Sequence, residues 1–234
     1  MLRKLILATT IISVITIGAC SSTKQSQIDD VETSGFLGDY SMLEKGEEGQ
    51  ALLRYIKKDH KFSKYTKVML KPVSVWASKD MSEEELTLEE KQEFADTYFT
   101  VLYKQISEYM PISRRMDDNT MVVEVALTNA EKSNATMDTI STVIPVGLVV
   151  SSTKELFGGK AIYTGTAASE IKITDGGTGE VIAAAVDERW GAKNLKDSHE
   201  KWSDVVNSME IWGERLAKGI CMEVKQDWKY CDSE

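Results

Sequence analysis

Apolar residues follow two different periods along this chain, and the order of these periods restricts the fold class more than any other feature. Runs of β-prone residues lie at 66–76, 120–127, 161–174 and 180–190, and apolar residues alternate along the first of them, which is typical of β-strands. Runs with helical spacing lie at 82–109 and 199–225. This order predicts a single α+β domain in which a mixed sheet of four or five strands packs with two long helices and one short helix.

Turn and capping residues mark the ends of these runs. Two capping-box signatures, at 82–85 and 87–90, precede the first long helix, and Pro111 ends it. Pro72 interrupts the first strand-like run and places part of it at a sheet edge or a bulge. The sequence DGGTG at 175–179 predicts a hairpin turn. A phosphate-binding loop would instead need a helix directly after its glycines.

Three further segments lie outside these runs, two before the first helix and one after it. Residues 35–41 contain two glycines and three apolar or aromatic side chains, which predicts an irregular segment packed onto a surface, and 52–56 predicts a short strand. Thr139 to Phe157 is the most apolar stretch after the first twenty residues. Because Pro145 and Gly147 interrupt it, we expect a short helix entered through Pro145.

This apolar stretch has two possible uses, and the sequence leaves both open. It packs onto the sheet, or part of it stays exposed as a contact surface for a partner or for a membrane. The candidate contact residues are Ile140, Val143, Ile144, Val146, Leu148 and Val149.

The first nineteen residues have the pattern of a secretory signal peptide. Arg3 and Lys4 precede an apolar stretch shorter than the ~20 residues that cross a bilayer, and small residues end it. Residues 17–20, IGAC, resemble the lipobox of bacterial lipoproteins, which implies that Cys20 carries acyl chains such as palmitate and is the mature N-terminus. An ordinary signal peptide with an incidental cysteine is the alternative. In such lipoproteins, an aspartate directly after the lipidated cysteine retains the protein at the inner membrane. This chain has Ser21 at that position, which favours the outer membrane and a periplasmic domain.

The mature chain is expected to be acidic. Removal of residues 1–19 takes away two positive charges and no acid, which changes the net charge from −9 to −11. This charge argues against nucleic acid as a partner, because phosphate binding needs clustered Lys and Arg. Residues 20–33 are polar and predict a flexible, lipidated tether, which leaves 34–234 as the periplasmic domain.

Cysteine usage fits an oxidising compartment. The chain has three cysteines, and lipidation of Cys20 leaves an even pair. We therefore expect Cys221 and Cys231 to form a disulfide. Two independent thiols are the alternative.

No motif of a known catalytic, metal or cofactor site occurs in the sequence, so we expect no enzymatic activity, no cofactor and no metal. His60 and His199 stand in charged surroundings without a second ligand at metal spacing. Acids far apart in sequence can still meet in space. Asp39, Asp187 and Glu188 are candidates for such a pair of catalytic carboxylates. An envelope glycan hydrolase is therefore the alternative function.

Four segments together resemble an uncharacterised family of Gram-negative lipoproteins with a domain of unknown function. They are SGFLGDYS at 34–41, FSKYTKVMLKPVSVW at 62–76, STVIPVG at 141–147 and GEVIAAAVDERWG at 179–191. The resemblance implies a lipid-anchored periplasmic domain and supplies no catalytic residues. The favoured hypothesis is a binding or scaffolding module that contacts an envelope protein, peptidoglycan or the lipid transport machinery.

Overall fold

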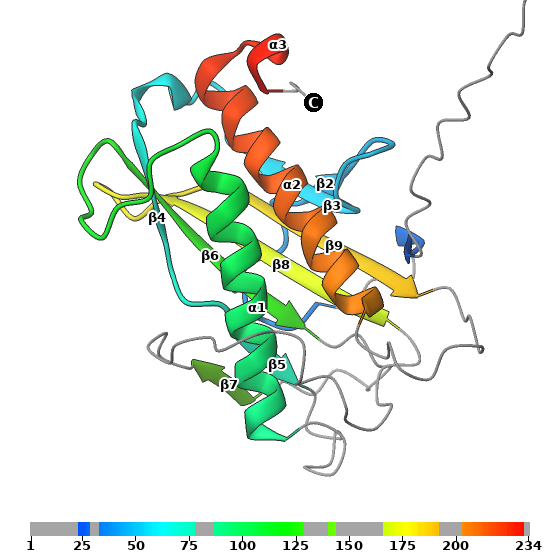
Figure 1. Cartoon of the computed structure of the whole chain (residues 1–234). Coiled ribbons are helices and arrows are strands. Elements are labelled where there is room, and N and C mark those ends of the chain that lie inside the picture. Colours follow the sequence, from blue (N-terminus) through cyan, green and yellow to red (C-terminus); the bar gives the residue numbers. More distant parts are fainter. Residues whose placement is uncertain are drawn as a thin grey trace, which may run out of the picture.

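The computed structural model describes residues 23–28, 33–77, 87–128, 140–143, 166–191 and 203–231. In this part of the chain, one mixed sheet carries two long helices on one of its faces (Figure 1). The α+β class predicted from the sequence is confirmed.

Three long strands form the centre of the sheet. They are β6 (Thr120–Thr128), β8 (Thr166–Asp175) and β9 (Val181–Gly191), and β8 pairs antiparallel with both neighbours. The β8–β9 pair is the predicted hairpin. Gly179 in its turn has a φ of 74°, a conformation that glycine adopts without strain.

Shorter strands extend the sheet on both sides of this centre. Beyond β9 lie β1 (Thr23–Gln25), β2 (Glu44–Lys45) and β3 (Leu53–Ile56), and beyond β6 lie β4 (Lys67–Leu70), β5 (Ser74–Ala77) and β7 (Ile140–Val143). The prediction of four or five strands was therefore too low. One reason is that two short strands share one row on each side: β1 and β3 both pair with β9, while β4 and β5, separated by Pro72, both run parallel to β6. The other reason is that β2 and β7 add a row at each end of the sheet.

Helix α1 (Leu88–Ser107) begins at the second predicted capping box. The amide of Glu90 donates to Thr87 Oγ1 (3.3 Å), and the amide of Thr87 donates to Glu90 Oε2 (2.8 Å). These two bonds satisfy amides that have no partner within the helix. The buried stripe of α1 then follows the predicted spacing, with Phe94, Ala95, Tyr98, Leu102 and Ile106.

Helix α2 (Ser203–Lys225) packs beside α1 on the same face of the sheet. Tyr98 Oη of α1 lies 2.8 Å from Ser169 Oγ on β8, and Trp212 Nε1 of α2 donates to Asp187 on β9 (2.8 Å). Ser169 and Asp187 are direct neighbours across the hairpin, so their side chains share one face. Figure 1 shows both helices on that face. No helix among the described residues is long and apolar enough to cross a membrane.

The opposite face of the sheet is partly covered by the segment 34–43, which is irregular as predicted. Leu37 packs against Ala184 and Val186 of β9. Tyr40 Oη donates to the fully buried Glu170 (2.6 Å), which also accepts the amide of Ser34 (2.7 Å). Burial, followed by the hydrogen bond to Glu170, raises the pKa of Tyr40 to about 12.

Three regions differ from the expected organisation or fall outside the described residues. Residues 23–25, expected within a flexible tether, form strand β1, and Arg189 Nη2 donates to the carbonyl of Thr23 (3.0 Å). The apolar stretch 139–157 contributes β7, while the helix expected from Pro145 lies outside the described residues. The structure does describe a short α-helix, α3 (Trp228–Cys231), near the C-terminus, and a 3-10 helix, η2 (Phe62–Lys64), between β3 and β4.

Candidate functional site

Asp187 does not converge with the other two carboxylates considered for hydrolysis. Asp187 and Glu188 are consecutive residues of β9, so their side chains point to opposite faces of the sheet. Asp39 lies in the exposed part of the segment 34–43. Paired-acid chemistry needs two carboxyl groups on the two sides of one substrate bond, which this arrangement does not provide.

Asp187 instead connects four elements. Its buried carboxylate accepts hydrogen bonds from Trp212 Nε1 of α2 (2.8 Å), the amide of Leu52 before β3 (3.1 Å) and Gln25 of β1. Arg215 of α2 completes the group with an ion pair of 3.3 Å. Both carboxylate oxygens are therefore engaged, and the acid fixes α2 against the edge of the sheet.

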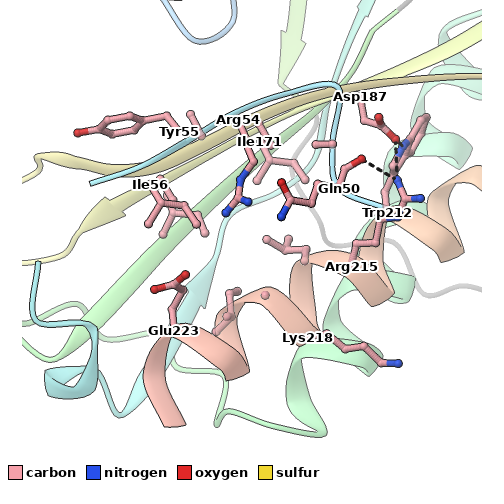
Figure 2. Close-up of a pocket in the computed structure, with 18 of the residues that line it drawn as sticks. Gln50, Arg54, Tyr55, Ile56, Ile171, Asp187, Trp212, Arg215, Lys218 and Glu223 are labelled. Carbon is pink, nitrogen blue, oxygen red and sulfur yellow. Dashed lines mark hydrogen bonds and ion pairs between the residues drawn. The ribbon is translucent and has the colours of Figure 1, made fainter. Parts of the chain in front are cut away.

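Next to Asp187, a cavity of about 460 Å³ lies between the sheet and α2 (Figure 2). One wall is formed by strands β3, β8 and β9, and the other by α2. Its apolar lining includes Ile56, Ile171, Ala183, Ala185, Leu216 and Ile220. A volume of this size and an apolar lining with few polar groups are typical of small-molecule sites.

Small side chains on both walls create this space. Ala183 and Ala185 occupy the helix-facing positions of β9, where larger β-formers would fill the gap. Gly219 lies opposite on α2, and a Cβ added there would meet no atom within 4 Å. The opening between strand and helix therefore follows from the volumes of residues that are far apart in sequence.

Charged side chains stand at the sides of the cavity. Arg54 of β3 points between the sheet and α2, and Glu223 lies on α2 at the other side (Figure 2). Among the described residues, neither side chain forms a hydrogen bond or ion pair. Lys218 also lines the cavity, but it pairs with Glu214 one helical turn away (3.1 Å).

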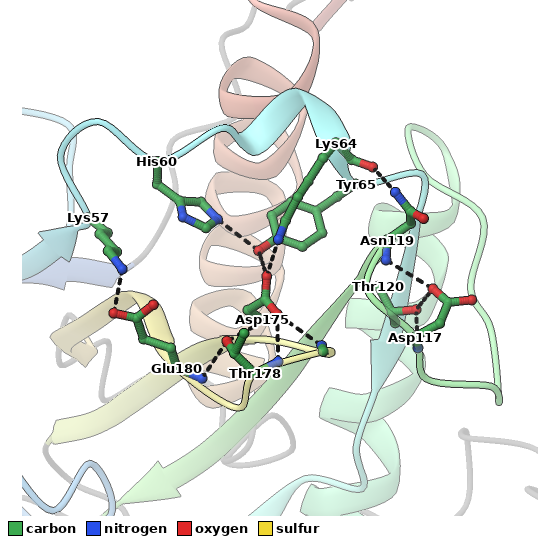
Figure 3. A network of polar contacts seen from close by, with 11 residues as sticks. Lys57, His60, Lys64, Tyr65, Asp117, Asn119, Thr120, Asp175, Thr178 and Glu180 are labelled. Carbon is green, nitrogen blue, oxygen red and sulfur yellow. Dashed lines mark hydrogen bonds and ion pairs between the residues drawn. The ribbon is translucent and has the colours of Figure 1, made fainter.

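The glycine-rich turn of the β8–β9 hairpin is not a phosphate site. Asp175 Oδ1 accepts the amides of Gly177 (2.9 Å) and Thr178 (2.8 Å), so the donors that a phosphate would need are occupied (Figure 3). Asp175 Oδ2 accepts the hydroxyl of Tyr65 (2.7 Å) and the ammonium group of Lys64. This network joins the turn to the segment between β3 and β4.

The two histidines were considered as metal ligands and interpreted instead as surface residues. His60 Nε2 lies 2.8 Å from Tyr65 Oη, at the margin of the Asp175 network, whereas His199 lies outside the described residues. Within the described ranges, no group of three His, Cys, Asp or Glu residues is placed to hold a metal ion.

The cysteines and the contact surface are placed as follows. Cys221 of α2 and Cys231 of α3 form a disulfide, with their Cα atoms 5.7 Å apart. Cys20 lies outside the described residues. Of the candidate contact surface, Ile140 and Val143 belong to β7, and Ile144, Val146, Leu148 and Val149 lie outside the described part of the chain.

Asp187 lines this cavity, and sequence reasoning considered it for a different role, as one of the acids of a hydrolase. Two signals could have indicated the site. Three consecutive alanines, 183–185, are unusual in a central strand. Arg54 interrupts the apolar run 52–56, which is uncommon for a strand expected to pack against a core.

Comparison with known proteins gives a family match and several distant structural neighbours. Residues 32–216 match the profile of the family described as "Protein of unknown function (DUF3313)". No curated protein matches the chain. The PelC dodecamer from Paraburkholderia phytofirmans in space group P6 is 11% identical, with a TM-score of 0.35 over 70% of this chain and 94% of that chain. A PelC variant in space group C2 is 10% identical, with a TM-score of 0.35 over 70% of this chain and 93% of that chain.

Proposed function

Since this chain belongs to the DUF3313 family of proteins of unknown function, its role has to be inferred from its own residues, and we propose that it is a lipid-anchored binding protein of the bacterial envelope. In this proposal, Cys20 carries the lipid, the domain faces the periplasm from the outer membrane, and the cavity between the sheet and α2 binds a small apolar ligand.

The cavity is the observation that carries the binding role. It is a void in an otherwise buried layer, although filling it with larger side chains would be the simplest way to stabilise the fold. Asp187 and Glu188 point to opposite faces of the sheet and Asp39 is exposed, so the geometry favours ligand binding over the paired-carboxylate hydrolase.

Strand β1 supports a close association with the membrane. Only Ser21 and Ser22 separate Cys20 from Thr23, the first residue of β1. Three residue steps span at most about 11 Å, so a lipid on Cys20 holds this edge of the sheet near the headgroups. A lipid-anchored domain meets membrane-derived ligands at a high effective concentration.

Binding to the cavity is tested with the neutral fluorescent probe N-phenyl-1-naphthylamine. We use the mature chain, residues 20–234, with Cys20→Ser so that no detergent is needed. The probe should bind saturably, and Ala185→Phe should weaken binding at least about tenfold, because the ring occupies the cavity. Thr100→Phe is the matched control, since it places the same ring at an exposed position of α1.

Thermal unfolding of both variants shows whether the fold is retained. If Ala185→Phe is folded and binds the probe as tightly as the parent protein, the cavity is not the binding site. If the parent protein shows no saturable binding, the proposed binding role is wrong.

A further inference from the structure

Arg54 has an unusual position for a charged residue. Along β3, Leu53 and Tyr55 pack with the cluster on the outer face of the sheet, whereas Arg54 and Ile56 face α2. Arg54 is directly opposite Ala185 on β9, a residue too small to cover it. The guanidinium group therefore lies along the alanine row, inside a cavity with mostly apolar walls (Figure 2).

No anionic side chain neutralises Arg54 among the described residues. Glu44 is its neighbour on β2, and Glu223 lies across the cavity on α2, but neither comes within 4.0 Å of its nitrogen atoms. The cavity's other acid, Asp187, is paired with Arg215. A guanidinium group carries five donors in a planar fork that fits a carboxylate or a phosphate, and here those donors have no acceptor in the part of the chain that the structure describes.

We propose that the cavity binds a single-chain amphiphile whose anionic head, a carboxylate or a phosphate, contacts Arg54. This inference rests on the proposed binding function and specifies its ligand. The apolar chain lies between Ala183 and Ala185 on β9 and Leu216 and Ile220 on α2. Charge complementarity favours an anionic head. Of the three cations that line the cavity, Arg215 and Lys218 each have an ion pair, whereas Arg54 has none within the described residues.

Calorimetric titration with four probes of equal chain length tests this inference. The probes are dodecanoate, dodecyl phosphate, dodecanol and dodecyltrimethylammonium, each below its micellar concentration. The mature Cys20→Ser protein should bind the better anion about tenfold or more tightly than dodecanol, since hydrogen bonds to charged groups contribute roughly that much. Preference for dodecyl phosphate indicates a lipid phosphate head, and preference for dodecanoate indicates a free fatty acid.

Three variants assign the effect to the named residues. Arg54→Gln should lower anion affinity to the level of dodecanol and leave dodecanol binding unchanged. Lys57→Gln removes the same charge just after β3, at a side chain that pairs with Glu180 outside the cavity, and should change nothing. Ala185→Phe should abolish binding of all four probes.

The outcomes separate this inference from the function on which it rests. If dodecanol or the cationic probe binds as tightly as both anions, or if Arg54→Gln retains the anion preference, the headgroup assignment is wrong and the cavity remains a binding site. If no probe binds to the folded parent protein, both proposals fail.

Discussion

At the scale of single residues, Asp175 shows how one carboxylate fixes a turn. Its side chain is 3% exposed. Burial alone would raise the pKa of Asp175, but the hydrogen bonds from Lys64, Tyr65 and the amides of Thr178 and Gly177 outweigh burial and hold this pKa well below its usual range. The ionised form is therefore the one that stabilises the folded state.

The low pKa of Asp175 predicts a pH-dependent loss of stability. Because the folded-state pKa lies below the unfolded value of about 3.9, the contribution is complete above that value and is lost as the pH falls towards the folded pKa. Asp175→Asn should lower the free energy of unfolding at pH 7 by about 1–3 kcal/mol. This difference from wild type should shrink below about pH 4.

Urea unfolding at pH 7, 5, 4 and 3 measures this difference. Asp118→Asn, at an exposed position beside the same turn, is the control and should match wild type throughout. A difference for Asp175→Asn that is as large at pH 3 as at pH 7 would contradict the assigned pKa.

At the scale of elements, helix α2 carries two glycines in different surroundings. A Cβ at Gly219 meets no atom within 4 Å, whereas a Cβ at Gly213 would lie 2.3 Å from Gln105 Oε1 and 3.1 Å from Val101 Cγ1 of α1. Gly213 therefore permits the close approach of α1 and α2, whereas Gly219 leaves space at the cavity.

These surroundings predict opposite effects of the same substitution. Gly219→Ala should stabilise the protein by about 0.5–1 kcal/mol, because alanine loses less backbone entropy in a helix. In Gly213→Ala, the contact with α1 should cancel or exceed that gain. Parallel chemical denaturation of the two variants tests this, and equal stabilisation by both would show that α1 does not restrict position 213.

The disulfide holds α3 against the end of α2. Both cysteines are buried, with 0% of Cys221 and 1% of Cys231 exposed. Trp228 and Tyr230, which lie between them in the sequence, are exposed. Alkylation of the unreduced, purified mature protein should modify neither cysteine. The paired change Cys221→Ala with Cys231→Ala should cost at most about 3 kcal/mol, the estimate for a loop of this length. Two alkylated thiols before reduction would refute the disulfide.

At the scale of the whole molecule, the decisive prediction concerns Cys20. The basic start, the apolar stretch and the small residues before Cys20 motivate it. Wild-type protein should fractionate with the outer membrane, and Cys20→Ala should leave an uncleaved or soluble precursor. A matched Ser22→Ala variant should behave as wild type. Equal amounts of wild type and Cys20→Ala in the outer membrane would show that Cys20 is not the anchor.

The sequence alone determined those parts of the fold whose cause is local. The β-prone runs on the two sides of the β8–β9 turn, the capping box at Thr87 and the helical spacing in α2 depend on residues a few positions apart, so each was predictable. Even the irregular segment 34–43 followed from its glycines and aromatic side chains.

Only the tertiary structure decided how short strands share a row and where the cavity lies. β1 is a polar triplet that forms a strand because β9 extends beyond β3 and offers it free backbone groups. The cavity depends on Ala185, Gly219 and Arg54, which come from three elements separated by many residues. A void is the difference between the space that elements enclose and the volume of the side chains that meet there, and that difference exists only after the chain has folded.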